Sequence, residues 1–332
     1  MYETSYHKSD LSAYSFLVTG GAGFIGSNLV EYLIKYGAGK VKVLDNLSTG
    51  FLNNIEPYLN HPSFEFIQGD IRDVETCQKA CQGTDIVFHE AALGSVPRSI
   101  QDPITTNSVN ISGFLNILVA ARDQKVKRFI YAASSSTYGD SKKLPKKEEE
   151  IGKPLSPYAV TKYVNELYAD VFAKTYSMQL IGLRYFNVFG PRQSPEGAYA
   201  AVIPIFIQAF SKNTSPFVDG DGEQTRDFTF IENAIQANIK AAFTSNEKSF
   251  NQVFNTAVGD RTSLNKVAFY IKEIAGASVN PTYRAPRAGD IRDSHADISK
   301  AKELLDYSPL VRIEEGLKIT YNWFCKENIY SK

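Results

Sequence analysis

The sequence predicts an α/β fold, a doubly wound parallel sheet followed by a smaller mixed lobe. Short, continuous apolar runs alternate with longer amphipathic stretches through the first half of the chain, and a glycine-rich segment follows the first run. After about Asn187 prolines and glycines break up this alternation. Continuous apolar strands separated by helices are typical of a parallel sheet that is covered on both faces.

The expected elements follow one another as strand and helix. The apolar runs predict strands at residues 16–18, 41–44, 86–88, 129–132 and 179–183, with a further strand ending before residue 69. The stretches with helical spacing predict helices at residues 23–36, 77–81, 111–122 and 159–174. This order is that of a Rossmann fold.

The domain organisation follows from where the pattern changes. We predict a Rossmann domain over residues 1–187, together with parts of 227–259. Residues 188–332 are expected to form the smaller lobe, which would be partly interleaved with the first domain.

Composition excludes several classes of function. The chain has 332 residues with 36 basic and 36 acidic side chains, so a chain-wide attraction to nucleic acid or to an anionic membrane is not expected. Three cysteines do not form a disulfide framework, and the four histidines lack ligand spacing, so no metal site is predicted. Without a secretory signal or an apolar run of about 18 residues, a cytoplasmic protein is expected.

The glycine-rich segment carries the first functional prediction. Gly20 permits a tight turn, Gly23 lets the backbone approach a pyrophosphate, and Gly26 allows close packing of helix and strand. Asp45 ends the second strand, 19 residues after Gly26, where a carboxylate binds ribose hydroxyls and repels a 2′-phosphate. A purely structural turn would not require this spacing, so the expected cofactor is NAD. Residues 69–71, Gly-Asp-Ile, suit the adenine edge.

A tyrosine and a lysine carry the second prediction. Tyr158 and Lys162 lie four residues apart, on one face of an expected helix. The lysine charge and the positive nicotinamide ring should favour the phenolate and lower the pKa of the tyrosine, so that it can take a proton from a sugar hydroxyl. Ser134 and Ser135, directly after a strand, could relay that proton, although such a turn also suits a simple strand cap.

The order of these motifs resembles that of one enzyme family. The segments TGGAGFIGS, DNLSTG, GDIRD, AALGSVPRS, AASSSTYGD, SPYAVTK, LRYFNVFGPRQ and GDGEQTRDF follow one another as in extended short-chain dehydrogenases/reductases, the NAD-dependent epimerase/dehydratase family. The similarity covers residues 15–325 and is greatest to bacterial UDP-N-acetylglucosamine 4-epimerases.

The resemblance implies roles for individual residues. Tyr158 would be the catalytic base and acid, tuned by Lys162, with Ser134 and Ser135 at the sugar hydroxyl. The residues implied for NAD are Gly20, Gly23, Phe24, Ile25, Gly26, Asp45, Asn46, Ser48, Thr49, Gly50, Asp70, Ile71, Ala91, Ala92, Leu93, Asn107, Tyr158, Lys162, Phe186 and Val188. Those implied for a UDP-sugar, chiefly in the smaller lobe, are Ser95, Ser134, Ser135, Tyr158, Asn187, Val202, Phe217, Asp219, Arg226, Arg261, Arg292 and Ser294.

Two of these implications have a chemical reason and an alternative. Arginines suit a diphosphate because their planar fork pairs two oxygens, but each of Arg226, Arg261 and Arg292 also suits a surface ion pair. Ser294 stands where epimerases restricted to glucose and galactose carry a tyrosine, so a serine leaves room for an acetamido group. An ordinary loop serine is the alternative.

The resemblance also implies the reaction. Dehydratases and decarboxylases of the superfamily carry a carboxylate in the tract before Tyr-Gly, where this chain has Ser135, Ser136 and Thr137. A transient C4 ketone could then only be reduced again, which favours a UDP-N-acetylglucosamine/UDP-N-acetylgalactosamine 4-epimerase. The alternatives are 4-epimerisation of a UDP-uronate or UDP-glucose, another NAD-dependent dehydratase or decarboxylase, and a catalytically silent NAD-binding regulator.

Relatives pair as homodimers through helices near residues 107–123 and 159–176, which together form a four-helix bundle. The resemblance therefore implies a homodimer, and Ile111, Leu115, Leu118 and Val119 suit either that contact or core packing.

Overall fold

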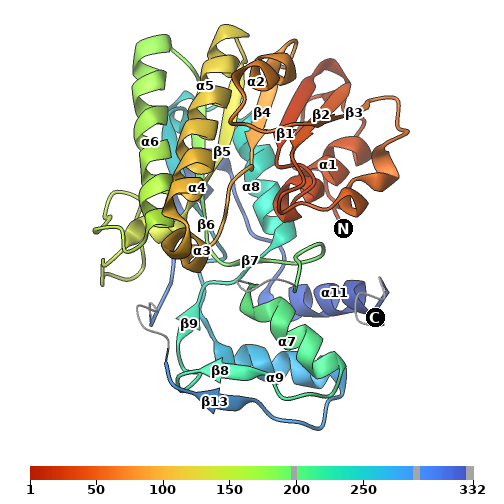
Figure 1. The fold of residues 1–332 in the computed structure, drawn as a ribbon, viewed down its shortest axis with the longest axis vertical. Helices are drawn as coiled ribbons and strands as arrows, with labels where there is room; N and C mark the ends of the chain where they lie inside the picture. Colours follow the sequence, from red (N-terminus) through yellow and green to blue (C-terminus); the bar gives the residue numbers. More distant parts are fainter. Residues whose placement is uncertain (196–199, 287–291, 327–332) are drawn as a thin grey trace.

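A computed structural model describes residues 1–195, 200–286 and 292–326 (Figure 1). Within them a seven-stranded sheet has the order β3-β2-β1-β4-β5-β6-β11, and every neighbouring pair is parallel. Its strands are β1 (Ser15–Thr19), β2 (Lys40–Asp45), β3 (Phe64–Gln68), β4 (Ile86–His89), β5 (Arg128–Ser134), β6 (Leu180–Tyr185) and β11 (Gln252–Thr256). The predicted doubly wound α/β fold is confirmed.

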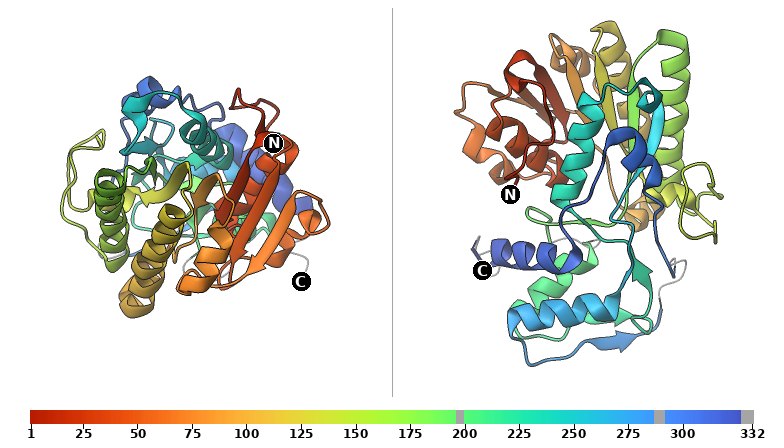
Figure 2. Two further views of the ribbon diagram at one scale, coloured as in Figure 1. Left: turned by 90° about the horizontal axis from the view of Figure 1, so that it is seen from above. Right: turned by 180° about the vertical axis from the view of Figure 1, so that it is seen from behind.

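Helices cover both faces of this sheet, as continuous apolar strands require. One face carries α1 (Phe24–Lys35) and α8 (Ile231–Phe243), and the other carries α2 (Val74–Cys81), α5 (Phe114–Asp123) and α6 (Pro157–Tyr176). Successive β1 residues serve the two layers in turn, since Phe16 and Val18 belong to the first core and Leu17 to the second. The helices α5 and α6 lie in front of the sheet in Figure 1, and the teal helix α8 lies in front of it in the right view of Figure 2, which is seen from behind.

The predicted helix over residues 111–122 is longer than expected. It begins with α4 (Pro103–Asn107), continues through the π-helical turn η4 (Ser108–Gly113) and ends as α5. Asp102 caps the start, where its side chain accepts a hydrogen bond from the Thr105 backbone N–H. The short helix α3 (Val96–Gln101) precedes it.

The continuous helix from α4 to α5 is apolar on average as well as long. Among the described residues, Pro103–Asp123 is long and apolar enough to cross a membrane by length and composition, with a mean hydropathy of 1.2. Polar residues such as Asn107, Asn110 and Asn116 interrupt the segment, so it is not the continuous apolar run of about 18 residues whose absence the sequence predicts. Packing explains part of its apolar character, because Phe114, Ile117 and Leu118 lie in the core beneath α2 and α6.

The smaller lobe consists of short elements below the sheet in Figure 1. Its helices are α7 (Val202–Ser211), α9 (Leu264–Ala275) and α11 (Ile313–Lys326), and α10 (Ser299–Leu305) packs back near β11. Three strand pairs connect distant segments: β7 (Val188–Phe189) with β10 (Thr229–Phe230), β8 (Phe217–Asp219) with β13 (Thr282–Arg284), and β9 (Thr225–Arg226) with β12 (Thr262–Ser263). The 3₁₀ turns are η1 (Leu11–Ala13), η2 (Leu52–Asn54), η3 (Glu56–Tyr58), η5 (Ser135–Tyr138) and η6 (Glu247–Ser249).

The two parts of the chain alternate along the sequence. After the β7–β10 segment the chain forms α8 and β11, both of which lie within residues 227–259 and belong to the sheet layer. The domain boundary at residue 187 stays a prediction.

Candidate active site

A cleft of about 600 Å³ lies along the carboxyl ends of the sheet strands. Residues at or after the ends of β1 to β6 line it, which is where ligands bind in open α/β sheets. A second cavity of about 760 Å³ extends between the sheet and the smaller lobe. Ser134, Ser135, Asn187 and Ala200 line both spaces, so the two adjoin there.

The glycine-rich turn is built for close approach of a phosphate. Gly20 has a φ of +70°, and a Cβ there would lie 2.7 Å from the Ala91 backbone nitrogen. A Cβ at Gly26 would lie 2.2 Å from the Gly20 carbonyl oxygen, so this helix cannot pack on its strand with any larger residue. Gly23 caps α1 without a side-chain hydrogen bond, which leaves backbone N–H groups directed at the cleft to bind an anion.

Two carboxylates, those of Asp45 and Asp70, line the same cleft near the glycine-rich turn. Asp45 is buried, and its oxygens accept hydrogen bonds from Ala22 N at 2.9 Å and Leu47 N at 2.8 Å. Burial raises the pKa of Asp45, although both backbone hydrogen bonds lower it. Asp70 pairs with Arg72 at 2.7 Å, and the Arg72 side chain lowers the pKa of Asp70 to about 2. Both residues line the cleft, so fixed acceptors are present for ribose and adenine groups.

The predicted catalytic residues meet at the other end of the cleft. Ser156 caps α6, where its Oγ accepts from Ala159 N at 3.1 Å, and this places Tyr158 in the first turn and Lys162 one turn later. Lys162 is 2% exposed, and its Nζ donates to the Ala132 carbonyl at 2.8 Å. Burial lowers the pKa of Lys162 to about 8.

The protein groups alone shift the pKa of Tyr158 upward, and the predicted lowering with the nicotinamide ring in place stays a prediction. Burial raises the pKa of Tyr158 above its ordinary value, the Ser134 hydrogen bond lowers it, and the Glu90 charge raises it. Lys162 is not among the groups that shift this pKa, and its ammonium donates to the Ala132 carbonyl on β5. The lowering contribution comes from Ser134 instead.

The hydrogen bonds of Ser134 explain how it acts on Tyr158. Its Oγ accepts from Ser136 N at 3.1 Å and from Ser136 Oγ at 2.8 Å. With both of these bonds accepted, the Ser134 hydroxyl still has its own proton, and its interaction with the Tyr158 oxygen lowers the pKa of that tyrosine.

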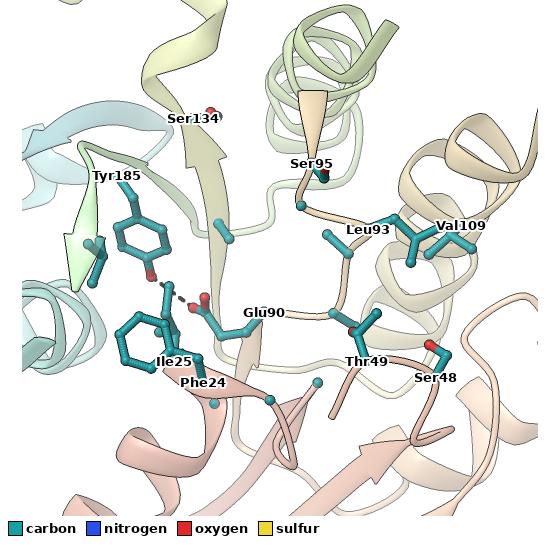
Figure 3. A pocket seen from close by; sticks show the side chains of 18 of the residues that line it. Phe24, Ile25, Ser48, Thr49, Glu90, Leu93, Ser95, Val109, Ser134 and Tyr185 are labelled. Atoms are coloured by element: carbon teal, nitrogen blue, oxygen red, sulfur yellow. Dashed lines mark hydrogen bonds between the residues drawn. The ribbon is translucent and has the colours of Figure 1, made fainter. Parts of the chain in front are cut away.

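Most of the residues implied for NAD line the cleft. Figure 3 shows Ser48 and Thr49 toward one end of it and Tyr185 and Ser134 toward the other. Those that line it are Gly20, Gly23, Phe24, Ile25, Gly26, Asp45, Asn46, Ser48, Thr49, Asp70, Ile71, Ala91, Ala92, Leu93, Tyr158, Lys162 and Val188.

Three residues implied for NAD are placed differently. Gly50 lies behind the glycine-rich turn, where a Cβ would meet the Ala22 backbone at 2.8 Å, so it supports the turn. Phe186 is buried and lines the second cavity instead. Asn107 lies outside the lining, and the nearby Asn110 instead holds the segment after β4, since its Oδ1 accepts from Leu93 N at 2.8 Å.

The residues implied for the UDP-sugar divide between the two spaces. Ser95 and Tyr158 line the first, Ser134, Ser135 and Asn187 line both, and the second cavity is lined by Val202, Phe217, Asp219, Arg226 and Ser294. Arg261 and Arg292 do not line either space, so their roles stay predictions. Arg261 is exposed beside β12, and Arg292 is exposed and pairs with Asp221 at 3.1 Å. Residues 289–291, which precede Arg292, lie outside the described residues.

The structure adds lining residues that the sequence did not predict. Glu90 and Tyr185 line the coenzyme cleft, and Arg284 lines the second cavity, where its guanidinium lies 5.3 Å from the Phe217 ring and pairs with Asp219. Glu90 directly follows the apolar strand β4, at the sheet edge where ligands bind. That position was the available signal for Glu90, whereas Arg284 depends on a long-range strand pair.

Comparison with known proteins agrees with this arrangement. A family model described as the NAD dependent epimerase/dehydratase family matches residues 16–257. A UDP-glucose 4-epimerase from Thermotoga maritima, solved with UDP-glucose, is 39% identical over 94% of this chain and 99% of that chain, with a TM-score of 0.88.

Two other solved structures are similar over nearly the whole chain. A UDP-N-acetylglucosamine 4-epimerase from Methanobrevibacter ruminantium, in complex with UDP-N-acetylmuramic acid, is 39% identical over 95% of this chain and 99% of that chain, with a TM-score of 0.89. A UDP-glucuronic acid 4-epimerase from Bacillus cereus, with UDP-glucuronic acid and NAD, is 32% identical over 94% and 99%, with a TM-score of 0.87. This chain therefore belongs to the NAD-dependent epimerase/dehydratase family and is an NAD-dependent enzyme.

Proposed function

We propose that the protein is a UDP-N-acetylglucosamine/UDP-N-acetylgalactosamine 4-epimerase. The observation that carries the proposal is the position of the Tyr158–Ser134 pair, where the coenzyme cleft adjoins the second cavity. A sugar in that cavity could present one hydroxyl to Tyr158 while its diphosphate and base extend into the smaller lobe. UDP-N-acetylhexuronate, UDP-glucose and UDP-galactose are further candidate substrates of the same chemistry.

The residues of the chain suggest how the proton is handled. Ser134 donates to the Tyr158 oxygen, so the phenolate form is stabilised when a substrate hydroxyl comes within reach. Tyr158 would take the proton of that hydroxyl in the oxidising half of the reaction and return it in the reducing half. NAD, when bound, supplies the acceptor and then the donor of the C4 hydride. Lys162, fixed on the Ala132 carbonyl, would hold the ribose next to the nicotinamide.

The serine turn supports epimerisation over dehydration or decarboxylation. Residues 135–137 provide only hydroxyl groups beside Tyr158. The Thr137 hydroxyl already donates to the Ser134 carbonyl at 2.8 Å. Elimination requires a base at a neighbouring carbon. Of the acids that line the second cavity, Asp219 pairs with Arg284 and Asp293 accepts from the Thr225 hydroxyl at 2.5 Å.

Binding of the nucleotide is proposed for the lobe side of the second cavity. Phe217 and the Arg284 guanidinium form a flat apolar and cationic wall suited to a uracil ring, and Arg226 supplies a second cation. Ser294 is held by a hydrogen bond from its backbone N–H to the Thr225 carbonyl at 3.0 Å, and its small side chain leaves room beside the sugar.

The proposal is tested with the purified protein and UDP-N-acetylglucosamine, without added reductant. We expect the galacto epimer to accumulate to an equilibrium mixture, and the relative kcat/KM for the uronate and the plain hexose gives the preferred sugar. A 4-keto-6-deoxy product or CO₂ would instead support the dehydratase or decarboxylase alternative. If none of these UDP-sugars is converted, the proposal is wrong.

We also propose that two copies associate. Ile104 on α4 is 81% exposed, and Leu167 and Val171 on α6 are 50% and 54% exposed. These apolar side chains lie on neighbouring helices, which suits the predicted four-helix bundle. Leu118 belongs to the core instead. The free thiols of Cys77, Cys81 and Cys325 suit the cytoplasmic location that the sequence predicts.

A further inference from the structure

A buried carboxyl group in the coenzyme cleft has no role in the proton path of Tyr158. Glu90 follows β4, and its backbone N–H donates to the Thr19 carbonyl at 3.1 Å, which fixes the residue at the sheet edge. Its Oε1 accepts from the Tyr185 hydroxyl at 2.9 Å, as Figure 3 shows. Its Oε2 is buried and has no hydrogen-bond partner among the described residues.

The surroundings determine which oxygen can change its protonation. Asn238 donates from Nδ2 to the Tyr185 oxygen at 2.8 Å, so the tyrosine proton is directed at Glu90 Oε1. Burial keeps the pKa of Tyr185 far above its ordinary value, so this donor stays neutral. Oε2 is therefore the oxygen that can gain or lose a proton.

Charged and titratable groups around Glu90 come from three elements. Lys162 and Tyr158 on α6 both interact electrostatically with it, and Tyr185 on β6 donates to it. His89 on β4 is neutral, because burial lowers its pKa to about 3. Burial raises the pKa of Glu90 to about 7, while the Tyr185 hydrogen bond and the Lys162 charge lower it.

Glu90 lies in the half of the cleft where the coenzyme reacts. The ring that exchanges hydride must contact the same carbon whose hydroxyl Tyr158 handles. One continuous cleft is lined by Glu90, Tyr158, Lys162 and Tyr185. The Glu90 charge interacts electrostatically with both Tyr158 and Lys162. The nicotinamide ring carries one positive charge when oxidised and none when reduced, so the charge next to Glu90 changes during the reaction.

We propose that Glu90 is a proton-linked counter-ion of the coenzyme, ionised beside the oxidised nicotinamide and protonated beside the reduced one. When the ring is oxidised, the carboxylate offsets its charge in a low-dielectric cleft. When the ring becomes neutral, the carboxylate loses that partner and takes up a proton at Oε2. The net charge of the pair is then zero in both states.

The atoms and electrons balance without another reactant. In the oxidising half the C4–H bond breaks, its two electrons go with the hydrogen to the ring, and the hydroxyl proton goes to Tyr158. Glu90 in addition takes one proton from the solvent. In the reducing half the hydride returns to C4, the proton on Tyr158 returns to the hydroxyl oxygen, and the proton on Glu90 returns to the solvent. Near and above pH 7 this linkage favours the oxidised coenzyme, which is the form that starts each cycle.

The test measures the redox state of the bound coenzyme without any sugar. The holoenzyme is equilibrated with a reversible redox dye between about pH 5 and about pH 9, and the reduced fraction is read from the near-ultraviolet absorbance of the coenzyme. The reduced-to-oxidised ratio on the protein is divided by that of free coenzyme in the same mixture. For the unaltered protein this quotient should fall by up to about tenfold per pH unit in a window ending near pH 7, and level off above it.

Two variants and a control make the result specific. Glu90→Gln should make the quotient independent of pH, whereas Glu56→Gln, an exposed glutamate, should keep the full slope. Tyr185→Phe removes the donor that favours the ionised carboxylate, so the window should move to higher pH.

A flat quotient in the unaltered protein, a retained slope in Glu90→Gln, or an unmoved window in Tyr185→Phe would each overturn the proposal. If Glu90→Gln does not fold, the Tyr185→Phe window decides. Because no sugar is present, the outcome does not depend on which UDP-sugar is the substrate, and failure of the epimerase proposal would be seen in a different experiment.

Discussion

At the scale of single residues, the proton transfer is assigned to Tyr158. Tyr158→Phe keeps the ring but removes the hydroxyl to which Ser134 donates. Loss of a general base costs about 10²–10⁴-fold in rate, so kcat should fall by at least this factor. Coenzyme content should be unchanged, since the residues expected at the phosphates and the adenosine ribose lie at the other end of the cleft. A variant that keeps more than a tenth of the original kcat would contradict the assignment.

Glu90 gives a prediction about stability in the protein without coenzyme. Its pKa is raised from an ordinary glutamate value to about 7, so the native state binds the proton more tightly than the unfolded chain. The associated stability is present below the unfolded pKa of about 4.3 and is lost as the pH rises to about 7. The Glu90→Gln variant has no group that titrates at this position, so its stability should not fall in this way as the pH rises.

The measurement is urea unfolding of both proteins between about pH 5 and about pH 8. The free energy of unfolding of Glu90→Gln, relative to the unaltered protein, should rise across this range by up to roughly 3 kcal/mol. The absolute difference also contains the cost of a buried amide group without a partner, so the pH dependence is the informative quantity. A difference that stays constant with pH would show that Glu90 titrates normally.

The sequence predicted the site residues unevenly at this scale. Tyr158, Lys162 and Ser134 could be assigned because spacing and chain order fix their chemistry. Glu90 was missed because its position after β4 indicates only the sheet edge, while its hydrogen-bond partner Tyr185 and the Asn238 behind it come from β6 and α8. The direction of the Tyr158 pKa was also out of reach, since it depends on burial.

At the scale of elements, the contact between β1 and α1 is set by Gly26. A Cβ there would lie 2.2 Å from the Gly20 carbonyl oxygen, and neither backbone can move without opening the turn. Gly26→Ala should lower the free energy of unfolding by about 1–3 kcal/mol and weaken coenzyme binding. Gly94→Ala, where a Cβ would meet nothing within 4 Å, is the control and should not lower stability. Equal behaviour of the two variants would contradict the packing argument.

The exposed apolar face of α6 gives a prediction about assembly. Leu167→Glu places a charge in the proposed helix bundle, so the variant should elute as a monomer where the unaltered protein elutes as a dimer. Phe269 on α9 is 58% exposed, and Phe269→Glu, away from this face, should remain dimeric. Light scattering on a sizing column measures both. If the unaltered protein is a monomer, the proposal that two copies associate through a four-helix bundle is wrong.

Elements were predicted where their pattern is local. The strands of the first half are apolar runs, and α1, α5 and α6 have apolar residues at helical spacing. The helix α8 was not predicted, and its burial includes polar side chains such as Asn233, Gln236 and Asn238, which find partners only in the folded chain. β11 joins the sheet only after the chain has passed through the smaller lobe, and no local signal marks that return.

At the scale of the whole molecule, the site exists only because the two parts of the chain are interleaved. The second cavity brings together residues from α3, η5, α7, β8 and β13, which are far apart in the sequence. Spacing therefore predicted most of the residues that line the first cleft and fewer of those that line the second cavity. Arg261 and Arg292 were assigned from the resemblance and lie at the surface, while Arg284 was found only through the β8–β13 pair.

The central claim is that one hydrogen leaves C4 of the sugar and returns to C4 within a closed cycle. UDP-N-acetylglucosamine carrying deuterium at C4 should therefore give a galacto epimer that retains the deuterium through many turnovers in ordinary water, as measured by mass spectrometry and NMR. Loss of the deuterium to the solvent at the rate of epimerisation would show that the carbon is deprotonated instead, and it would contradict the roles proposed for Tyr158 and the coenzyme.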